Sequence, residues 1–271
     1  MRLKAVLLFL SFSLLFSGPL SADNETLATI ESRPGVRQKF ILIQPPNPTA
    51  SVILFAGGHG ALDLAESAVG GVAIGWGENN FLVRTRRLFA DHGFTVAVVD
   101  APSDKKKMNA VWRMGAEHAQ DVLAVIQQIK KAADVPVWVV GTSMGTFSAA
   151  NAAVRLEPAV SGLVLTSTIT RSRRRWKIHR SHPKAVIDMA LETIRVPTLI
   201  AAHESDGCRI TPASDAGLLK AKLKNARTVK VVLFQGGDPP RSDPCQALSE
   251  HGFLGIEKKV VDAVAEFIEH N

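Results

Sequence analysis

The chain has 271 residues, 46% of them hydrophobic and 21% charged, which is typical of a globular protein and excludes a disordered, collagen-like or coiled-coil chain. The length allows one large core, and the formal net charge of +7 favours anionic partners. With no zinc-finger, RRM or KH signature and only 6% aromatic residues, the sequence gives no reason to expect a nucleic acid partner.

The first predicted element is a secretory signal peptide over residues 1–22. Arg2 and Lys4 precede an apolar run from Ala5 to Phe16, and small residues follow up to Ala22. This run is shorter than the about 18 to 20 apolar residues that a membrane anchor needs. We therefore expect cleavage, with an uncleaved anchor as the alternative. A periplasmic or secreted protein without a stable membrane anchor would result.

Residues 23–271 are expected to form one α/β domain, with a mostly parallel central sheet and helices on both faces. Short β-branched runs alternate with longer amphipathic stretches, and most of the runs are apolar throughout, as strands buried on both faces require. The predicted strands are Gln38–Ile43, Ser51–Ala56, Thr95–Asp100, Val135–Gly141, Ser161–Thr166, Pro197–Ala202 and Val229–Phe234. The predicted helices are Phe81–His92, Ala116–Ala132, Thr146–Leu156 and Ile256–Ile268.

The pentapeptide Gly141-Thr142-Ser143-Met144-Gly145 matches the pattern Gly-x-Ser-x-Gly. Alone the match is weak, but here it directly follows a predicted strand and runs into a predicted helix. A tight strand-to-helix turn exposes the serine, and the flanking glycines avoid clashes. Ser143 is therefore the predicted nucleophile, and the Met144 N–H is a predicted oxyanion donor. A glycine-bounded turn with an incidental serine is the alternative.

A serine nucleophile needs a base, and in this architecture an acid and then a histidine follow it in the chain. Asp206 follows the predicted strand Pro197–Ala202, and His251 follows the last predicted strand after a loop. Both are expected at the sheet edge that holds Ser143, with Glu204 as the rival carboxylate. For the other helical or basic-segment histidines we expect solvated surface positions: His92, His118, His179, His182 and His270.

Two further loops bear on this site. Cys208 and Cys245 are expected to form a disulfide in an oxidising compartment, which would join the acid loop to the histidine loop. Two independent buried thiols are the alternative. The loop Gly57-Gly58-His59-Gly60 is expected to supply the second oxyanion donor, from Gly58 or His59, with a flexible turn as the alternative. No histidine or cysteine pair has finger-like spacing, and the glycine loop does not fit the dinucleotide pattern G-x-G-x-x-G, so we expect no metal or organic cofactor.

The order of strand, glycine-rich loop, nucleophile elbow, acid loop and late His-Gly resembles the α/β-hydrolase superfamily over roughly residues 37–271. Asp206-Gly207-Cys208, and Cys245 before His251-Gly252-Phe253, resemble a group of exported bacterial hydrolases of undefined substrate. The resemblance implies a Ser143–His251–Asp206 triad that hydrolyses a carboxylic ester through an acyl-enzyme. A peptidase, a thioesterase and a non-catalytic binding protein of the same fold remain alternatives.

A short basic insertion is expected after the strand Ser161–Thr166, at about residues 169–195, where this superfamily commonly places a cap over its pocket. Seven cations crowd together there: Arg171, Arg173, Arg174, Arg175, Lys177, Arg180 and Lys184. Their charge indicates an anionic small-molecule acyl substrate or an envelope surface, and Arg173, Arg174 and Arg175 are the candidate substrate-binding residues. A solvated helix face is the alternative.

Overall fold

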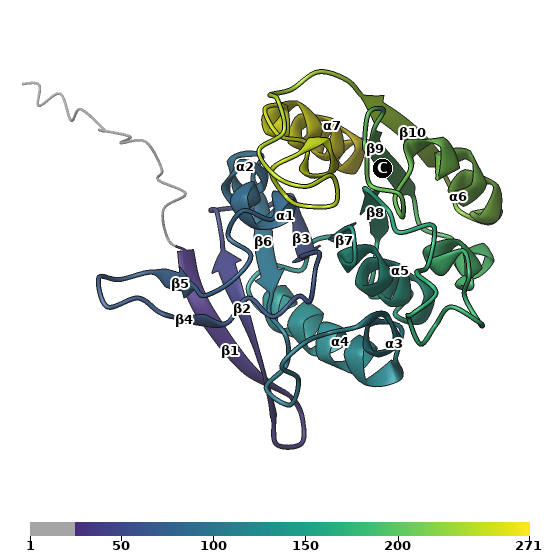
Figure 1. Ribbon diagram of the computed structural model, residues 1–271. Helices are drawn as coiled ribbons and strands as arrows, with labels where there is room; N and C mark the ends of the chain where they lie inside the picture. The colour runs from purple at the N-terminus through teal and green to yellow at the C-terminus, as the bar shows by residue number, and fades with distance from the viewer. Residues whose placement is uncertain (1–24) are drawn as a thin grey trace, which may run out of the picture.

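The computed structural model describes residues 25–271, so the predicted signal peptide lies outside the described residues. Its main feature is an eight-stranded sheet with the order β1-β2-β6-β3-β7-β8-β9-β10 (Figure 1). In that order the strands are β1 (Glu25–Arg33), β2 (Val36–Ile43), β6 (Phe94–Val99), β3 (Ala50–Phe55), β7 (Val137–Thr142), β8 (Gly162–Thr166), β9 (Thr198–His203) and β10 (Val229–Phe234). A separate hairpin, β4 (Leu64–Glu66) with β5 (Val72–Ile74), projects from one side of the body.

The sheet is parallel from β6 to β10, and β2 pairs antiparallel with both β1 and β6. Every residue of the central strands β6, β3, β7, β8 and β9 is buried, which explains their unbroken apolar sequences. The predicted mostly parallel sheet is confirmed. The edge strand β1 is absent from the prediction because its sequence is polar and only partly buried.

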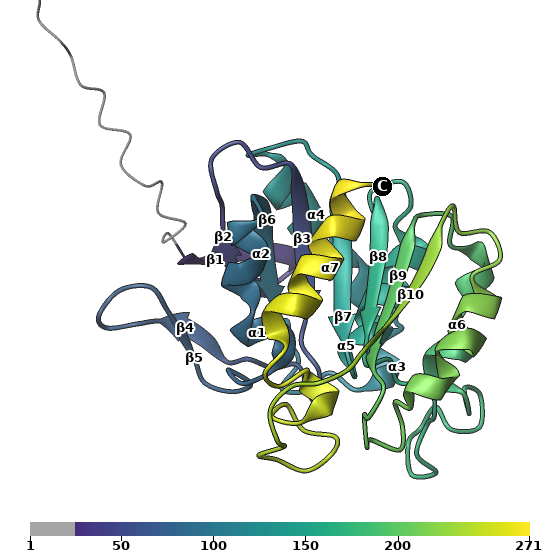
Figure 2. The same cartoon turned by 90° about the horizontal axis from the view of Figure 1, so that it is seen from above.

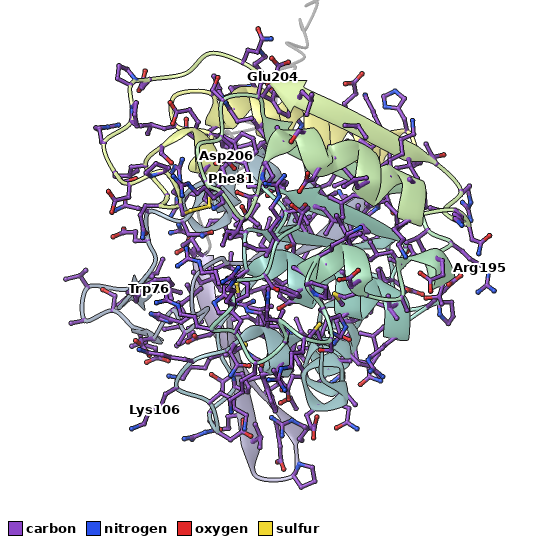
Figure 3. The ribbon with its side chains drawn as sticks, turned by 45° about the vertical axis from the view of Figure 1, so that its right-hand side comes forward. Trp76, Phe81, Lys106, Arg195, Glu204 and Asp206 are labelled. Atoms are coloured by element: carbon purple, nitrogen blue, oxygen red, sulfur yellow. A yellow bond between two sulfur atoms is a disulfide. The ribbon has the colours of Figure 1, made fainter. Side chains whose placement is uncertain are left out.

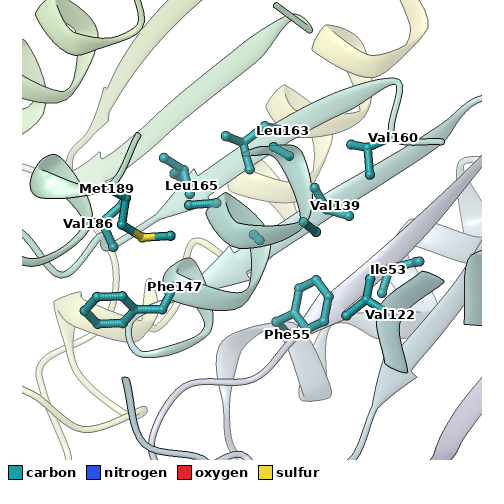
Figure 4. Packing of buried hydrophobic residues seen from close by; sticks show 14 of the residues in the cluster. Ile53, Phe55, Val122, Val139, Phe147, Val160, Leu163, Leu165, Val186 and Met189 are labelled. Atoms are coloured by element: carbon teal, nitrogen blue, oxygen red, sulfur yellow. The ribbon is translucent and has the colours of Figure 1, made fainter. Parts of the chain in front are cut away.

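Helices cover both faces of the sheet (Figure 2). One face carries α3 (Ala110–Arg113), α4 (Ala116–Lys130), α5 (Gly145–Arg155) and α6 (Ala216–Lys222), and the other carries α1 (Phe81–Arg84), α2 (Arg86–Asp91) and α7 (Glu257–Glu269). Figure 4 shows the first of the two cores, where Phe147 of α5 packs near Leu165 of β8. The predicted helix Phe81–His92 divides in two at Thr85, which caps both halves. No helix among residues 25–271 is long and apolar enough to cross a membrane.

The segment between β8 and β9, where the basic insertion is predicted, has two unlike halves. Its first half, residues 171–184, consists of turns with its arginine and lysine side chains exposed. Its second half holds two 3₁₀ turns, η1 (Ala185–Asp188) and η2 (Leu191–Thr193), and buries Val186 and Leu191 in the core beside α5. The second half is thus part of the domain body, and a cap role for the first half stays a prediction.

The sheet order places one crevice above the centre of the sheet. After β3 the chain passes to β6 on one side, whereas β7 lies on the other side of β3, with Phe55 paired to Gly141. In open parallel sheets, ligands bind where the strand order reverses in this way, beyond the carboxyl ends of the strands. The loop after β3 and the loop after β7 therefore meet at this crevice.

Candidate active site

The turn between β7 and α5 holds Ser143 in a left-handed backbone conformation, with a φ of 51°. Hydrogen bonds fix the turn on both sides. The Ser143 N–H donates to the Thr166 carbonyl at 3.1 Å, and the Ser143 carbonyl accepts from the Thr146 N–H at 3.0 Å and from its hydroxyl at 2.6 Å. A non-glycine residue in this region is strained and persists only where the surroundings enforce it. The backbone is thus the tight elbow that the motif predicts.

The glycines that flank the elbow are required because no side chain would fit at these positions. A Cβ on Gly141 would collide with the Gly145 backbone, and a Cβ on Gly145 would collide with the Phe55 carbonyl of β3. Side chains at these positions would therefore push the first turn of α5 away from the sheet. Because α5 begins just after Ser143, its free N–H groups point toward the crevice.

Asp206 and His251, which lie 45 residues apart, meet at this end of the sheet. The His251 Nδ1 lies 3.0 Å from the Asp206 Oδ2, and the side chains are 6% and 0% exposed. The Asp206 carboxylate also accepts from the Cys208 N–H and from the Thr211 hydroxyl, both at 2.9 Å. An ionised carboxylate can only accept hydrogen bonds, so its contact with Nδ1 favours the tautomer that has its proton on Nδ1 and leaves Nε2 free to accept one.

Thr211 is absent from the sequence prediction. Its hydroxyl lies 2.9 Å from the Asp206 Oδ2 and 3.1 Å from the His251 Nδ1, and the residue is 1% exposed. One buried hydroxyl thus contacts both members of the pair. No local pattern marks it, because the contact depends on a turn after β9 that brings Thr211 back over Asp206.

Glu204, the rival carboxylate, is bonded elsewhere. It is exposed and accepts a hydrogen bond from the Gln235 side chain at 2.6 Å. Figure 3 shows Glu204 at the upper margin of the molecule and Asp206 further inside. Of the two carboxylates, only Asp206 contacts His251.

His118 corrects one expectation, since it is buried in α4 rather than solvated. Neither ring nitrogen has a hydrogen-bond partner among residues 25–271, and the ring lies edge-on to Phe55 at 5.9 Å between centroids. Burial, with a smaller contribution from the nearby cations Arg113 and Arg33, lowers the pKa of His118 to about 3. The ring is therefore a neutral part of the core near neutral pH. The sequence does not predict this burial, because a histidine can lie on the polar or on the apolar face of an amphipathic helix such as α4.

The predicted disulfide is present. Cys208 and Cys245 are bonded, with 4.7 Å between their Cα atoms, and they connect the loop after β9 to the loop between β10 and α7. Asp206, Cys208 and His251 bring potential metal-ligand atoms within 4.8 Å of one another. Because the sulfur of Cys208 is bonded to Cys245, this group offers two free ligand atoms, too few for a typical zinc site.

Ser143 and His251 line the same cleft, which has a volume of about 510 Å³. All three predicted oxyanion residues, Met144, Gly58 and His59, line it as well. Arg173 reaches this cleft from the basic segment, whereas Arg175 lines a neighbouring cleft and Arg174 lines neither.

The glycine-rich loop after β3 packs closely against Trp76, another residue that sequence reasoning missed. Gly58 has a φ of +57°, and a Cβ there would collide with the Trp76 ring. That ring packs against the His59 ring, with 3.7 Å between centroids and a tilt of 31°. Burial lowers the pKa of His59, and the charge of Lys107 lowers it further. The loop is thus an ordered wall of the cleft.

The side chain of Arg113 packs against this loop at Gly60. It is fully buried and donates to the Ala56 carbonyl at 3.1 Å, the Ser148 hydroxyl at 2.8 Å and the Met108 carbonyl at 3.3 Å. Burial lowers the pKa of Arg113 to about 9. The guanidinium therefore connects the end of β3 to α5, the two elements that lead into the cleft. A lone arginine in a helical stretch is usually exposed, so no sequence pattern indicates this role.

Comparisons with known proteins agree with this architecture. A family model described as serine aminopeptidase, S33, matches residues 81–228. The sequence finds no match among functionally curated proteins. Among solved structures, Est1E from Butyrivibrio proteoclasticus is 16% identical with a TM-score of 0.59, over 90% of this chain and 98% of that chain.

Two further structures share the fold. Dienelactone hydrolase from Anabaena variabilis is 15% identical with a TM-score of 0.58, over 91% of this chain and 97% of that chain. XC6422 from Xanthomonas campestris, described as a serine hydrolase without lid, is 15% identical with a TM-score of 0.56, over 93% of this chain and 97% of that chain. At these identities the likeness concerns the fold.

Proposed function

Because the chain belongs to the α/β-hydrolase family described as serine aminopeptidase, S33, we propose that it is a serine hydrolase that cleaves carboxylic esters. The observation that carries the proposal is the buried Asp206–His251 hydrogen bond at 3.0 Å, beside an elbow that holds Ser143 in the same cleft. A serine, a histidine and a carboxylate in this relation are the parts that acyl transfer to water requires.

In the proposed mechanism, Ser143 attacks the ester carbonyl while the His251 Nε2 takes its proton. Asp206 holds the imidazole by Nδ1 and stabilises the charge that the ring gains. The N–H of Met144 and an N–H of Gly58 or His59 would bind the oxyanion of the tetrahedral intermediate. His251 then returns the proton to the leaving alcohol, and water repeats the sequence on the acyl-enzyme.

A peptidase is the second candidate, because the family description names aminopeptidases. An aminopeptidase must bind the positively charged amino group of its substrate, which requires carboxylates near the nucleophile. In the cleft of Ser143 the exposed Glu78 is the one acidic side chain among the described lining residues, and Arg173 lines the same cleft. The charge of the cleft thus favours an ester over a peptide with a free amino terminus.

A fluorophosphonate probe tests the proposed nucleophile. The wild-type protein should be labelled on Ser143, and Ser143→Ala should abolish labelling and ester hydrolysis. Ser205→Ala, at an exposed serine, is the matched control and should leave both unchanged. A panel of esters, thioesters and aminoacyl amides then identifies the bond. Absence of labelling in the folded wild type would support a non-catalytic binding protein, and turnover of the amides alone would support the peptidase.

We also propose that the protein is exported and loses residues 1–22. The Cys208–Cys245 disulfide supports this, because such bonds persist mainly outside the cytoplasm. Mass spectrometry of the protein from a bacterial host should show a mature chain beginning near residue 23 in the periplasmic or culture fraction. A full-length chain held in the cytoplasm would contradict export.

A further inference from the structure

A second cleft, of about 630 Å³, lies beside the one that contains Ser143. Residues 107–111 and residues 175–178 line it. Gly58, His59, Met144 and Trp176 line both clefts. Two of these shared residues, His59 and Met144, are candidate oxyanion donors. A substrate whose carbonyl lies at the oxyanion site can therefore extend directly into the second cleft.

The charged residues of the second cleft all have one sign. Lys107, Arg175 and Lys177 line it and are exposed, and no acidic residue is among its described lining residues. None of the three has a carboxylate within 4.0 Å in the part of the chain that the structure describes. The charge of Lys107 also acts on His59, which lines both clefts, since it contributes to the lowered pKa of that histidine.

Two nearby cations, Arg171 and Lys105, differ from these three because they are already paired. Arg171 donates two hydrogen bonds to Asp215, both at 3.0 Å, and Lys105 lies 3.1 Å from Asp104. Burial would raise the pKa of Asp215, but the bonds from Arg171 and Thr170 outweigh it and hold the pKa below its ordinary value. Lys107, Arg175 and Lys177 line the second cleft without such a partner, so a ligand there can supply the missing charge.

The floor of the second cleft is apolar. Met108 and Ile178 are buried, and Ala110 and the Trp176 ring contribute further apolar surface. Such a surface suits a short hydrocarbon or aromatic spacer, whereas the cations around it suit an oxyanion at the end of that spacer.

We propose that the substrate is an ester whose one arm ends in a carboxylate or phosphate, and that Lys107, Arg175 and Lys177 bind this anionic end in the second cleft. The inference rests on the proposed function, because it places the ester carbonyl at Ser143. Arginine and lysine bind both kinds of oxyanion, so the two are distinguished by experiment.

The test uses paired chromogenic esters of equal length, one with a free terminal carboxylate or phosphate and one with the same terminus capped as a neutral ester. The wild type should show a higher kcat/KM for the anionic member. A comparison of kcat/KM between the carboxylate and phosphate esters then identifies the anionic group that the cleft prefers. Lys107→Gln/Arg175→Gln/Lys177→Gln should lower this preference about 10-fold, mainly through KM, because each exposed charge pair contributes only modestly to binding. Added salt should lower the wild-type preference in the same direction.

Arg174→Gln/Arg180→Gln is the matched control, because it removes two cations of the same segment that line neither cleft. It should leave the preference unchanged. Equal turnover of the charged and neutral esters by the wild type, or equal loss of preference in the control, would overturn the inference while leaving the hydrolase intact. Binding of a terminal dicarboxylate or phosphate ester product to Ser143→Ala, measured by calorimetry and weakened in the triple variant, gives a readout that does not depend on turnover.

Discussion

The loops that carry Asp206 and His251 differ from the basic segment 171–184 in how their polar groups are satisfied. In the loops, the Asp206 carboxylate has three hydrogen-bond donors, and a disulfide closes the structure around it. In the basic segment the arginine and lysine side chains are exposed, and three of them, Arg173, Arg175 and Lys177, line clefts without an acidic partner among the described residues. The first region is held in place by its own contacts, which suits residues that take part in the chemical step. In the second region the cations that line the clefts can be paired by a ligand, which suits residues that select the substrate.

The largest expected effect follows from breaking the acid–base pair. Asp206→Asn keeps the shape of the side chain but replaces an acceptor with a group that can donate to Nδ1, which favours the wrong histidine tautomer. Ester kcat should fall about 10⁴-fold, as for the equivalent change in other triads. Steady-state kinetics measures the loss. Glu204→Gln, two residues away and bonded to Gln235, should keep full activity, and an equal fall in this variant would contradict the assignment of Asp206.

Removal of the disulfide tests whether the two loops need their covalent connection. Cys208 and Cys245 are 37 residues apart, and the loop-closure entropy of such a bridge corresponds to about 4 kcal/mol. Cys208→Ala/Cys245→Ala should therefore lower the free energy of unfolding by about this amount, measured by urea denaturation. The wild type under reducing conditions should behave in the same way. Unchanged stability in both cases would show that the hydrogen bonds around Asp206 suffice.

The same contrast explains what the sequence can and cannot predict. Apolar runs fix the parallel strands, and the order of Ser143, Asp206 and His251 along those strands brings them to one edge, so strands and candidate triad are predictable. Thr211, Trp76 and Arg113 contribute through contacts with residues distant in sequence, which no local pattern records. The strand β1 was not predicted because many of its residues are polar, although it pairs with β2 along most of its length.

His118 offers a smaller effect on stability, measured as a dependence on pH. Its pKa is about 3 in the folded protein and about 6.5 in the unfolded chain, so between these values only the unfolded chain takes up a proton. Stability should fall as pH drops below 6.5, by about 3 kcal/mol at pH 4.5 from this group. His118→Phe removes no hydrogen bond among the described residues. In urea denaturation, it should reduce the slope of the unfolding free energy against pH by the amount that corresponds to about one proton. An unchanged slope would mean that the ring gains a partner in solution.

The smallest effect should come from Arg173, the cation of the basic segment that lines the cleft of Ser143. Its side chain is exposed, so its attraction to an anionic ester is weakened by water and salt. Arg173→Gln should raise KM for the anionic ester about 2- to 5-fold, leave kcat nearly unchanged and have no effect on the neutral ester. Arg174→Gln, the adjacent arginine that lines neither cleft, should change neither substrate. Equal effects of the two variants would mean that net charge near the cleft, and not the position of Arg173, governs binding.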